Sequence, residues 1–337
     1  MKPRIDRGYV GIPSFLRGPI CADLDRLDAA VAILGVPFDE GSPFLPGSRM
    51  APRALREHSL RFGSEGLFDP ETGITLLGQD LAAGLIADAG DVDIAPTHVE
   101  QTFASITADV TAILARGALP VVLGGDHSIT YPIVRAFPGP LHVLQFDAHM
   151  DYAGFEQGLR FTNGHAFRHI AGLDSVASLT QVGIRSLRSS RSQYEDMIAA
   201  GHRIVPMGEL RALGPAGIAA LLPEGAPLYV SIDVDALDMS LVPGCVSGEP
   251  NGMTYPELRE TLRRVAERCA VVGFDFVEVN PPLDVGTGAT AYLGALLVSE
   301  FLGQICAQPR FESRRAAVLA RRAAAQAHHH PQPGDLR

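Results

Sequence analysis

The stretch LHVLQFDAHMD (141–151) starts as an apolar strand and ends with an acid, a histidine and a second acid at alternate positions. Burying even one unpaired carboxylate costs several kcal/mol, so the charges at this strand end need a partner. Two further strand-like runs end in the same way, PVVLGGDHS (120–128) and LYVSIDVDALD (228–238). These three strand ends predict both the type of sheet and the place of its chemistry.

Apolar runs typical of buried strands alternate along the chain with segments of helical periodicity, such as residues 97–115 and 255–268. This alternation predicts an α/β protein, with a central, mostly parallel sheet between two layers of helices. The expected strands are residues 31–36, 119–123, 141–146, 180–183, 203–206, 228–232 and 270–274.

No linker longer than a loop divides the chain, which favours one large domain over two. We expect an N-terminal extension over residues 1–29 and a catalytic domain over residues 30–312. Residues 313–337 should form an Ala/Arg-rich helix followed by a flexible, histidine-containing tail.

With 46% hydrophobic and 20% charged residues, the chain of 337 residues is globular and able to bury a large core. A net charge of −10 argues against a nucleic-acid partner. The sequence shows neither a membrane-length apolar run nor a signal peptide, so we expect a cytoplasmic protein with no membrane partner. Four widely spaced cysteines without a CxxC pair predict neither a disulfide framework nor a thiolate metal site.

Polar residues at the three strand ends can meet, because the carboxyl ends of parallel strands form one crevice. Four carboxylates balance the charge of two divalent ions, and aspartates can bridge such a pair. An oxygen-rich set with two imidazoles favours Mn²⁺, with Ni²⁺, Co²⁺ or Zn²⁺ as alternatives. Acids that only cap helices or form ion pairs are the competing interpretation. The predicted metal ligands are His127, Asp147, His149, Asp151, Asp233 and Asp235.

Several motifs resemble, in order, those of the ureohydrolase superfamily of arginases, agmatinases and guanidino-acid hydrolases, with the agmatinase branch nearest. The matching segments are GVPFDEGSPFLPGSRMAPRALRE (35–57), GGDHS (124–128), FDAHMD (146–151), VGIRS (182–186), SIDVDALD (231–238) and FDFVEVNPPLD (274–284). The resemblance covers about residues 30–308.

The resemblance implies a three-layer fold, two Mn²⁺ ions and hydrolysis of a guanidino C–N bond to urea and an amine. His127 and Asp151 would bind one ion, His149 and Asp235 the other, and the remaining two aspartates would bridge them. Asp151 would also orient the attacking hydroxide, and Glu278 would bind the guanidinium group. Asp126 and Asp238 are expected to be hydrogen-bond acceptors or helix caps rather than ligands.

One position departs from the family pattern. Asn163 stands where agmatinases and arginases carry a histidine that passes a proton to the leaving amine. His165, two residues further on, is a candidate catalytic substitute because its pKa lies near neutrality, and a purely structural role is the alternative. Asn163 is then a candidate for substrate binding.

The loops around the site leave the substrate open. A small cationic guanidino compound is expected, either a linear guanidino amine or acid, or a small or alkylated guanidine or a biguanide such as metformin. Arg160 is the one evident cation in residues 152–160, so an acidic pocket with Glu156 and Glu278 would suit a wholly cationic substrate. The alternatives are a formimidoyl-group hydrolase that releases formamide, and a non-catalytic subunit of a hetero-oligomer. The family resemblance implies a homo-oligomer, commonly a trimer or hexamer.

Overall fold

The computed structural model describes residue 8 and residues 10–328, and the side chains of residues 327 and 328 are not described. The predicted tail histidines at 329 and 330 therefore lie outside the described residues. Within the described part, the strands are β1 Val31–Gly35, β2 Leu67–Asp69, β3 Ile74–Leu76, β4 Ile86–Asp91, β5 Leu119–Leu123, β6 Leu141–Phe146, β7 Val176–Ile184, β8 Arg203–Pro206, β9 Pro227–Asp233 and β10 Ala270–Val277.

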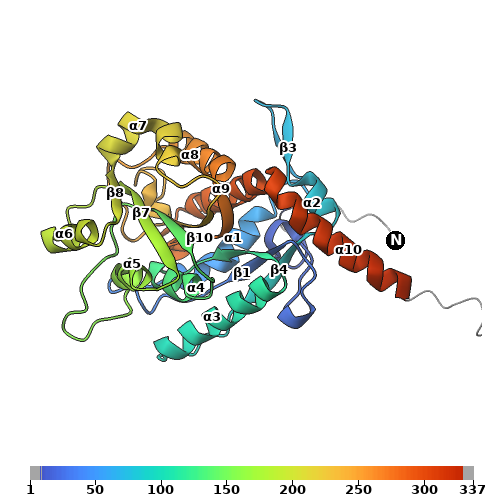
Figure 1. Cartoon of the computed structure of the whole chain (residues 1–337), viewed down its shortest axis with the longest axis horizontal. Coiled ribbons are helices and arrows are strands. Elements are labelled where there is room, and N and C mark those ends of the chain that lie inside the picture. Colours follow the sequence, from blue (N-terminus) through green and yellow to red (C-terminus); the bar gives the residue numbers. More distant parts are fainter. Residues whose placement is uncertain (1–7, 9, 329–337) are drawn as a thin grey trace, which may run out of the picture.

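Eight of these strands form one sheet in the order β4-β1-β5-β10-β9-β6-β7-β8. Every neighbouring pair in that sheet is parallel, while β2 and β3 form a separate antiparallel hairpin. The hairpin projects from the body of the molecule (Figure 1). The predicted parallel sheet is confirmed, and all seven expected strands are present.

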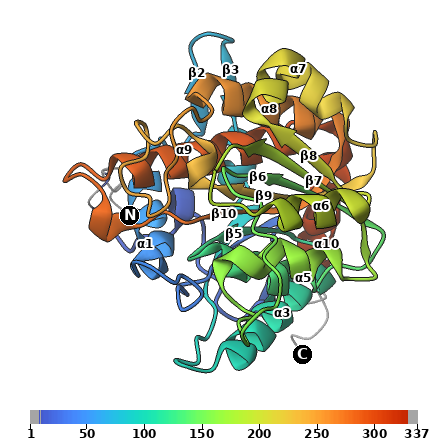
Figure 2. The same cartoon turned by 90° about the vertical axis from the view of Figure 1, so that its left-hand side faces the viewer.

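Helices cover both faces of the sheet (Figure 2). The described helices are α1 Ala51–Ser59, α2 Gly78–Ala82, α3 Val99–Ala115, α4 Thr130–Val134, α5 Ala166–Ala171, α6 Arg191–Ala199, α7 Met207–Ala220, α8 Tyr255–Arg268, α9 Ala289–Cys306 and α10 Glu312–His328. One layer contains α1, α7, α8 and α9, which pack against one another, and the other contains α3, α4 and α5. The three-layer α/β/α architecture expected from the sequence is therefore confirmed.

Helix boundaries follow local chemistry. Thr254 caps α8, because its side chain accepts from the backbone N–H of Glu257 while the Glu257 side chain accepts from the Thr254 backbone. In α3, the buried residues recur at three- and four-residue spacing, so one face of the helix packs on the sheet. These two helices begin within two residues of the starts that periodicity predicts.

Helix α9 is long and apolar enough to span a membrane, and 67% of it is buried inside the protein. Its contacts with α1, α8 and β10 are those of a core helix. The C-terminal helix α10 lies against the body through Arg315, which donates to both carboxylate oxygens of Asp80 at 2.7 and 2.9 Å. The domain boundaries proposed from the sequence stay predictions.

Candidate metal and substrate site

The end of β5 turns sharply through two glycines into His127. A Cβ atom on Gly125 would lie 1.7 Å from the Phe38 carbonyl oxygen, so only glycine allows this approach of the two backbones. Asp126 then caps the short helix that starts at His127, and its Oδ1 accepts from the Ser128 backbone N–H at 2.9 Å. This turn brings the His127 ring, which is fully buried, over the carboxyl edge of the sheet.

The end of β6 supplies Asp147, His149 and Asp151 from the stretch that opened the sequence analysis. The Gln145 side-chain amide donates to Asp147 Oδ2 at 2.6 Å and holds that carboxylate in place. Asp151 has a φ of +46°, a left-handed conformation that is costly for a residue with a side chain. Strain of this kind at a predicted ligand is typical of a functional site.

Asp233 is the last residue of β9 and Asp235 lies two residues beyond it. Strand β9 pairs with β6 on one side and β10 on the other. Asp233 Oδ1 accepts from the backbone N–H of Asp235 at 2.8 Å, and Asp235 Oδ1 accepts from the Ala148 backbone at 2.9 Å. One oxygen of each carboxylate therefore accepts a backbone hydrogen bond, and the second oxygen faces a histidine of the site.

Three carboxylates converge on one nitrogen of His127. Its Nδ1 lies 3.0 Å from Asp147 Oδ2, 3.1 Å from Asp151 Oδ2 and 3.1 Å from Asp233 Oδ2. None of these contacts has hydrogen-bonding geometry, so the buried Nδ1 lacks a hydrogen-bond partner among the described residues. A bound cation would relieve this crowding, because imidazole nitrogen and carboxylate oxygen are both metal ligands.

A second group lies beside the first. His149 Nδ1 lies 3.0 Å from Asp235 Oδ2 and 3.4 Å from Asp147 Oδ1. Asp147 therefore faces one histidine with each of its two oxygens, the position of a bridging ligand between two ions. Five of the six predicted ligands fall into two overlapping groups that share Asp147, each with three potential ligand atoms within 4.8 Å of one another, and Asp233 belongs to a third group with Asp235 and Cys245.

The cluster has more carboxylates than groups that can carry positive charge. Burial lowers the pKa of His149, but Asp235 and Asp147 outweigh that effect and raise it to about 12. The pKa of Asp233 is raised well above its ordinary value by burial and by the neighbouring Asp235 and Asp147. Two imidazoles are too few to balance four buried carboxylates, and divalent ions would supply the missing charge.

A hydrogen-bonded chain behind His127 was not anticipated from the sequence. The outer ring nitrogen, Nε2, lies 2.8 Å from Ser231 Oγ, which donates to Asp275 Oδ1 at 2.6 Å. Tyr229 and Thr130 donate to the other oxygen of Asp275 at 2.7 and 2.9 Å. Such a chain orients the ring so that Nδ1 faces the cluster. In the sequence, the signal for this chain is Asp275, an acid within the apolar run of β10, because a buried carboxylate needs hydrogen-bond donors.

Glu278 follows β10 and completes the row of strand ends. It has a φ of +65°, and its Oε1 accepts from the His127 backbone N–H at 2.9 Å and from the Asn163 side-chain amide at 3.1 Å. Burial and the nearby Asp126 raise the pKa of Glu278 to about 8. A buried carboxylate held in this way is suited to receive a cationic group.

These side chains surround a cavity of about 170 Å³. The volume is below the roughly 300–1,000 Å³ of pockets for drug-sized ligands, so the cavity suits a small molecule. Its described lining residues are Ser42, Pro43, Phe44, His149, Asp151, Asn163, Arg188, Asp233, Asp235, Val246, Ser247 and Glu278. Neither Glu156 nor Arg160 is among them, so the expectation of a wholly acidic pocket around Glu156 does not hold.

His165 is held away from this cavity. Its Nδ1 lies 2.6 Å from Thr162 Oγ1 and its Nε2 lies 3.1 Å from the Gly154 carbonyl oxygen, while its ring stacks on Phe155. It is not one of the described residues that line the cavity. The sequence-based prediction that His165 passes a proton to the leaving group would require the ring to give up both partners.

Replacing His165 by Ala is expected to leave bound metal unchanged and to lower both turnover and melting temperature, because two partly buried hydrogen bonds of the 152–165 loop are lost. Elemental analysis, a thermal melt and a pH–rate profile would measure this. If the ring only holds the loop, the profile keeps its shape. Loss of one side of the profile would instead identify His165 as the proton donor.

Two further residues of the site were missed in the sequence. Cys245 places its sulfur within 4.8 Å of carboxylate oxygens of Asp233 and Asp235, and burial together with these acids raises its thiol pKa well above the ordinary value. Arg188 lines the cavity four residues after the end of β7. Both come from loops, where sequence periodicity gives no positional signal.

Asp238 lies beside the ligands but serves its own loop. Its Oδ1 accepts from the Ser240 backbone and hydroxyl, and its Oδ2 accepts from the Gly252 backbone at 2.9 Å. These bonds hold the pKa of Asp238 at about 2. As expected for a capping residue, it belongs to none of the three ligand groups found among the described residues.

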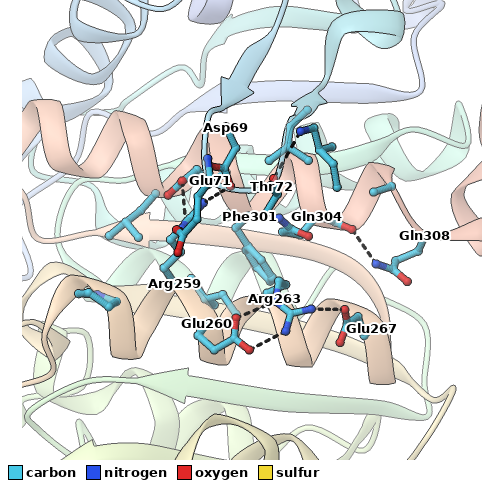
Figure 3. A pocket seen from close by; sticks show the side chains of 17 residues that line it. Asp69, Glu71, Thr72, Arg259, Glu260, Arg263, Glu267, Phe301, Gln304 and Gln308 are labelled. Carbon is cyan, nitrogen blue, oxygen red and sulfur yellow. Dashed lines mark hydrogen bonds and ion pairs between the residues drawn. The ribbon is translucent and has the colours of Figure 1, made fainter.

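A larger cavity, of about 580 Å³, lies between the β2–β3 hairpin, α8 and α9 (Figure 3). Its charged side chains already pair with one another: Arg259 contacts Asp69 at 3.0 Å, and Arg263 contacts Glu260 at 2.6 Å. No predicted site residue is among the described residues that line it. Cavity size is therefore no guide to the site in this protein.

A parallel sheet between two helical layers, with two imidazoles and four carboxylates at its carboxyl edge, is the arrangement expected of an enzyme with a dinuclear metal site. Comparisons with known proteins lead to the family. Residues 29–303 match the model of the arginase family.

Curated relatives extend the match over most of the chain. The mitochondrial guanidino acid hydrolase of Homo sapiens is 36% identical over 309 residues, covering 89% of this chain and 84% of the relative. The mitochondrial agmatinase of Gallus gallus is 34% identical over 302 residues, covering 87% and 85%. The solved structure of proclavaminate amidinohydrolase from Streptomyces clavuligerus superposes with a TM-score of 0.79 at 31% identity, covering 89% of this chain and 98% of that one.

The chain belongs to the arginase family. Enzymes of this family use a dinuclear metal site, which agrees with the two overlapping ligand groups described above.

Proposed function

We propose that this protein hydrolyses the guanidino C–N bond of a small substrate to urea and an amine at a dinuclear metal site. It is a hydrolase that acts on C–N bonds in linear amidines, as its family membership and named relatives indicate. One observation carries the proposal: four neighbouring strand ends, those of β5, β10, β9 and β6, bring six ligand side chains and Glu278 together at the carboxyl edge of the sheet.

Different residues of the site would bind the substrate and the metal ions. Glu278 would pair with the planar guanidinium, whose N–H groups match a carboxylate, and Asn163 keeps the Glu278 side chain in place. His127 and His149 would each hold one ion, with Asp151 and Asp235 as their respective partners and Asp147 and Asp233 between the two. Two divalent ions, when bound, lower the pKa of a shared water toward neutrality.

In the reaction, the water oxygen forms a C–O bond at the guanidinium carbon, and the bond from that carbon to the alkyl-bearing nitrogen breaks. The leaving nitrogen takes up a proton that the attacking water supplies. Asp151 lines the cavity, and its Oδ2 lies 3.1 Å from His127 Nδ1. This position supports the proposal that Asp151 orients the attacking water. Asn163 cannot act as the acid, because an amide does not titrate near neutral pH.

The finer assignments are proposals as well. Mn²⁺ is the ion we propose, since four carboxylates outnumber two imidazoles, and Ni²⁺ is the alternative. A cytoplasmic location and a homo-oligomer of three or six copies, or a hetero-oligomer, stay predictions. The suggestion of a biguanide such as metformin finds no support in the named relatives, whose names refer to agmatine or to guanidino acids.

The function is tested by incubating the metal-loaded protein with a panel of guanidino compounds and assaying urea. We expect urea from at least one member, together with two bound ions per chain by elemental analysis. Formamide from a formimidoyl compound, without urea from any guanidine, would transfer the assignment to a formimidoyl-group hydrolase. A protein that binds stoichiometric metal but turns over neither kind of substrate would be a non-catalytic subunit.

A further inference from the structure

The mouth of the metal cavity carries one cationic side chain. Of the described residues that line the cavity, Arg188 is the only arginine or lysine. Its side chain is 60% exposed, so the guanidinium group can reach a molecule entering from solvent. It lies on the segment between β7 and α6, outside the row of strand ends that supplies the predicted ligands.

Two guanidinium nitrogens, Nε and Nη2, hold the Arg188 side chain at this position. Its Nε donates to Glu249 Oε1 at 3.2 Å and its Nη2 donates to the Ser247 carbonyl oxygen at 3.2 Å. Its Nη1 has no hydrogen-bond partner among residues 10–328 for which contacts are described. Glu249 is more enclosed, with 23% of its side chain exposed, and its Oε1 also accepts from Ser186.

Arg188 Nη2 also lies 2.5 Å from His149 Nε2, and Glu249 Oε1 lies 3.6 Å from the same nitrogen. A histidine that holds an ion through Nδ1 carries its ring proton on Nε2, so that nitrogen would not accept from Arg188. The donor of Arg188 that is available to a ligand is therefore Nη1.

The cavity lining carries charges of opposite sign. Glu278 would be neutralised by the substrate's guanidinium group, whereas Arg188 keeps an N–H group, at Nη1, without a partner among the described residues. Glu249, the acid paired with Arg188, is not among the described lining residues. A substrate with a carboxylate on its tail would therefore pair with Arg188, whereas a substrate with an ammonium group on its tail would not.

We propose that Arg188 forms a carboxylate-binding subsite at the mouth of the cavity and that the substrate is a guanidino acid. The inference rests on the proposed amidinohydrolase function and narrows its substrate class. Arg188 would select the tail of the substrate, while Glu278 and the metal ligands act on the guanidinium group.

Three compounds with tails of similar length separate the possibilities: 4-guanidinobutyrate with a carboxylate, n-butylguanidine without a charge and agmatine with an ammonium. The wild-type protein should give its highest kcat/KM with 4-guanidinobutyrate. Arg188→Gln should lower that value about 10- to 100-fold, the usual effect of a charge-assisted hydrogen bond, and leave n-butylguanidine nearly unchanged. Arg188→Glu should reverse the preference toward agmatine, and Arg188→Lys should restore part of the lost kcat/KM.

Binding provides a readout that does not depend on turnover. Calorimetric titration with 4-aminobutyrate, the amine product of 4-guanidinobutyrate, should show weaker binding to Arg188→Gln than to wild type, and n-butylamine should not distinguish them. Arg191→Gln is the matched control, because Arg191 is 89% exposed on α6 and contacts Glu195 at 3.8 Å on its own helix. Metal content measured for each variant excludes an indirect effect through His149.

The subsite is refuted if wild type hydrolyses n-butylguanidine or agmatine as well as 4-guanidinobutyrate, or if Arg188→Gln weakens all three alike. Either result leaves the proposed function intact. Failure to hydrolyse any guanidine with two ions bound would instead remove the proposed function. In that case, equal binding of 4-aminobutyrate to wild type and Arg188→Gln would remove the subsite too.

Discussion

Asp147→Asn should release bound metal and abolish hydrolysis. Asp147 turns one oxygen toward each histidine, 3.0 Å from His127 and 3.4 Å from His149, so a neutral amide at this position would leave both ions underliganded. The loss should exceed the roughly 10- to 100-fold effect of removing a group that merely supports a ligand. Elemental analysis of the purified variant and a urea assay at saturating metal would measure it.

Asp238→Asn is the matched control for this change. Asp238 belongs to the same SIDVDALD segment as the ligands, but its oxygens accept from the Ser240 and Gly252 backbones rather than facing a histidine. It should keep two ions and most of the activity. Retention of two ions in Asp147→Asn would contradict the bridging assignment, and the same test applies to Asp233→Ala.

Glu278→Gln should keep both ions but lose turnover. The neutral amide preserves the shape of the side chain and removes the charge that pairs with the guanidinium group. Removing one partner of a buried ion pair costs about 3–5 kcal/mol, so kcat/KM should fall by roughly 10²- to 10⁴-fold. Steady-state kinetics with the best guanidine of the panel, together with metal analysis, would measure this.

Glu300→Gln serves as the control for a second largely buried glutamate. Glu300 lines the larger cavity and contacts Arg259 at 2.9 Å, away from the candidate metal site, so Glu300→Gln should leave kcat/KM unchanged. Unaltered kinetics in Glu278→Gln would exclude Glu278 from substrate binding. Loss of metal in that variant would place Glu278 among the groups that support the ions.

Most of the sheet was predictable, because buried parallel strands are short apolar runs and seven of the eight have that pattern. The exception is β4, Ile86–Asp91, whose sequence IADAGD mixes apolar residues with acids and a glycine. Asp88 is tolerated inside it because Arg56 of α1 donates to both of its oxygens at 2.9 and 3.0 Å. The partner lies 32 residues away in the sequence, and no local pattern reveals it.

The candidate site was predictable to a different degree in each of its parts. The six proposed ligands and Glu278 follow strands directly, so their spacing already places them at one edge of the sheet. Arg188, Cys245 and the chain from Ser231 to Asp275 were not found, since their roles depend on which segments meet. For His165, the sequence offered a titratable ring, and the structure shows both of its nitrogens occupied.

The sequence by itself determined the α/β class, the parallel sheet and the set of side chains that meet at its carboxyl edge. Strand periodicity is local, and every parallel strand delivers its end to the same side of the sheet. Only the tertiary structure decided what surrounds that set: Asn163 and Arg188 line the cavity, whereas His165 is buried beside it and bonded to its own loop. Loop conformation is set by contacts between distant segments, such as those of Arg188 with residues about 60 positions further along the chain.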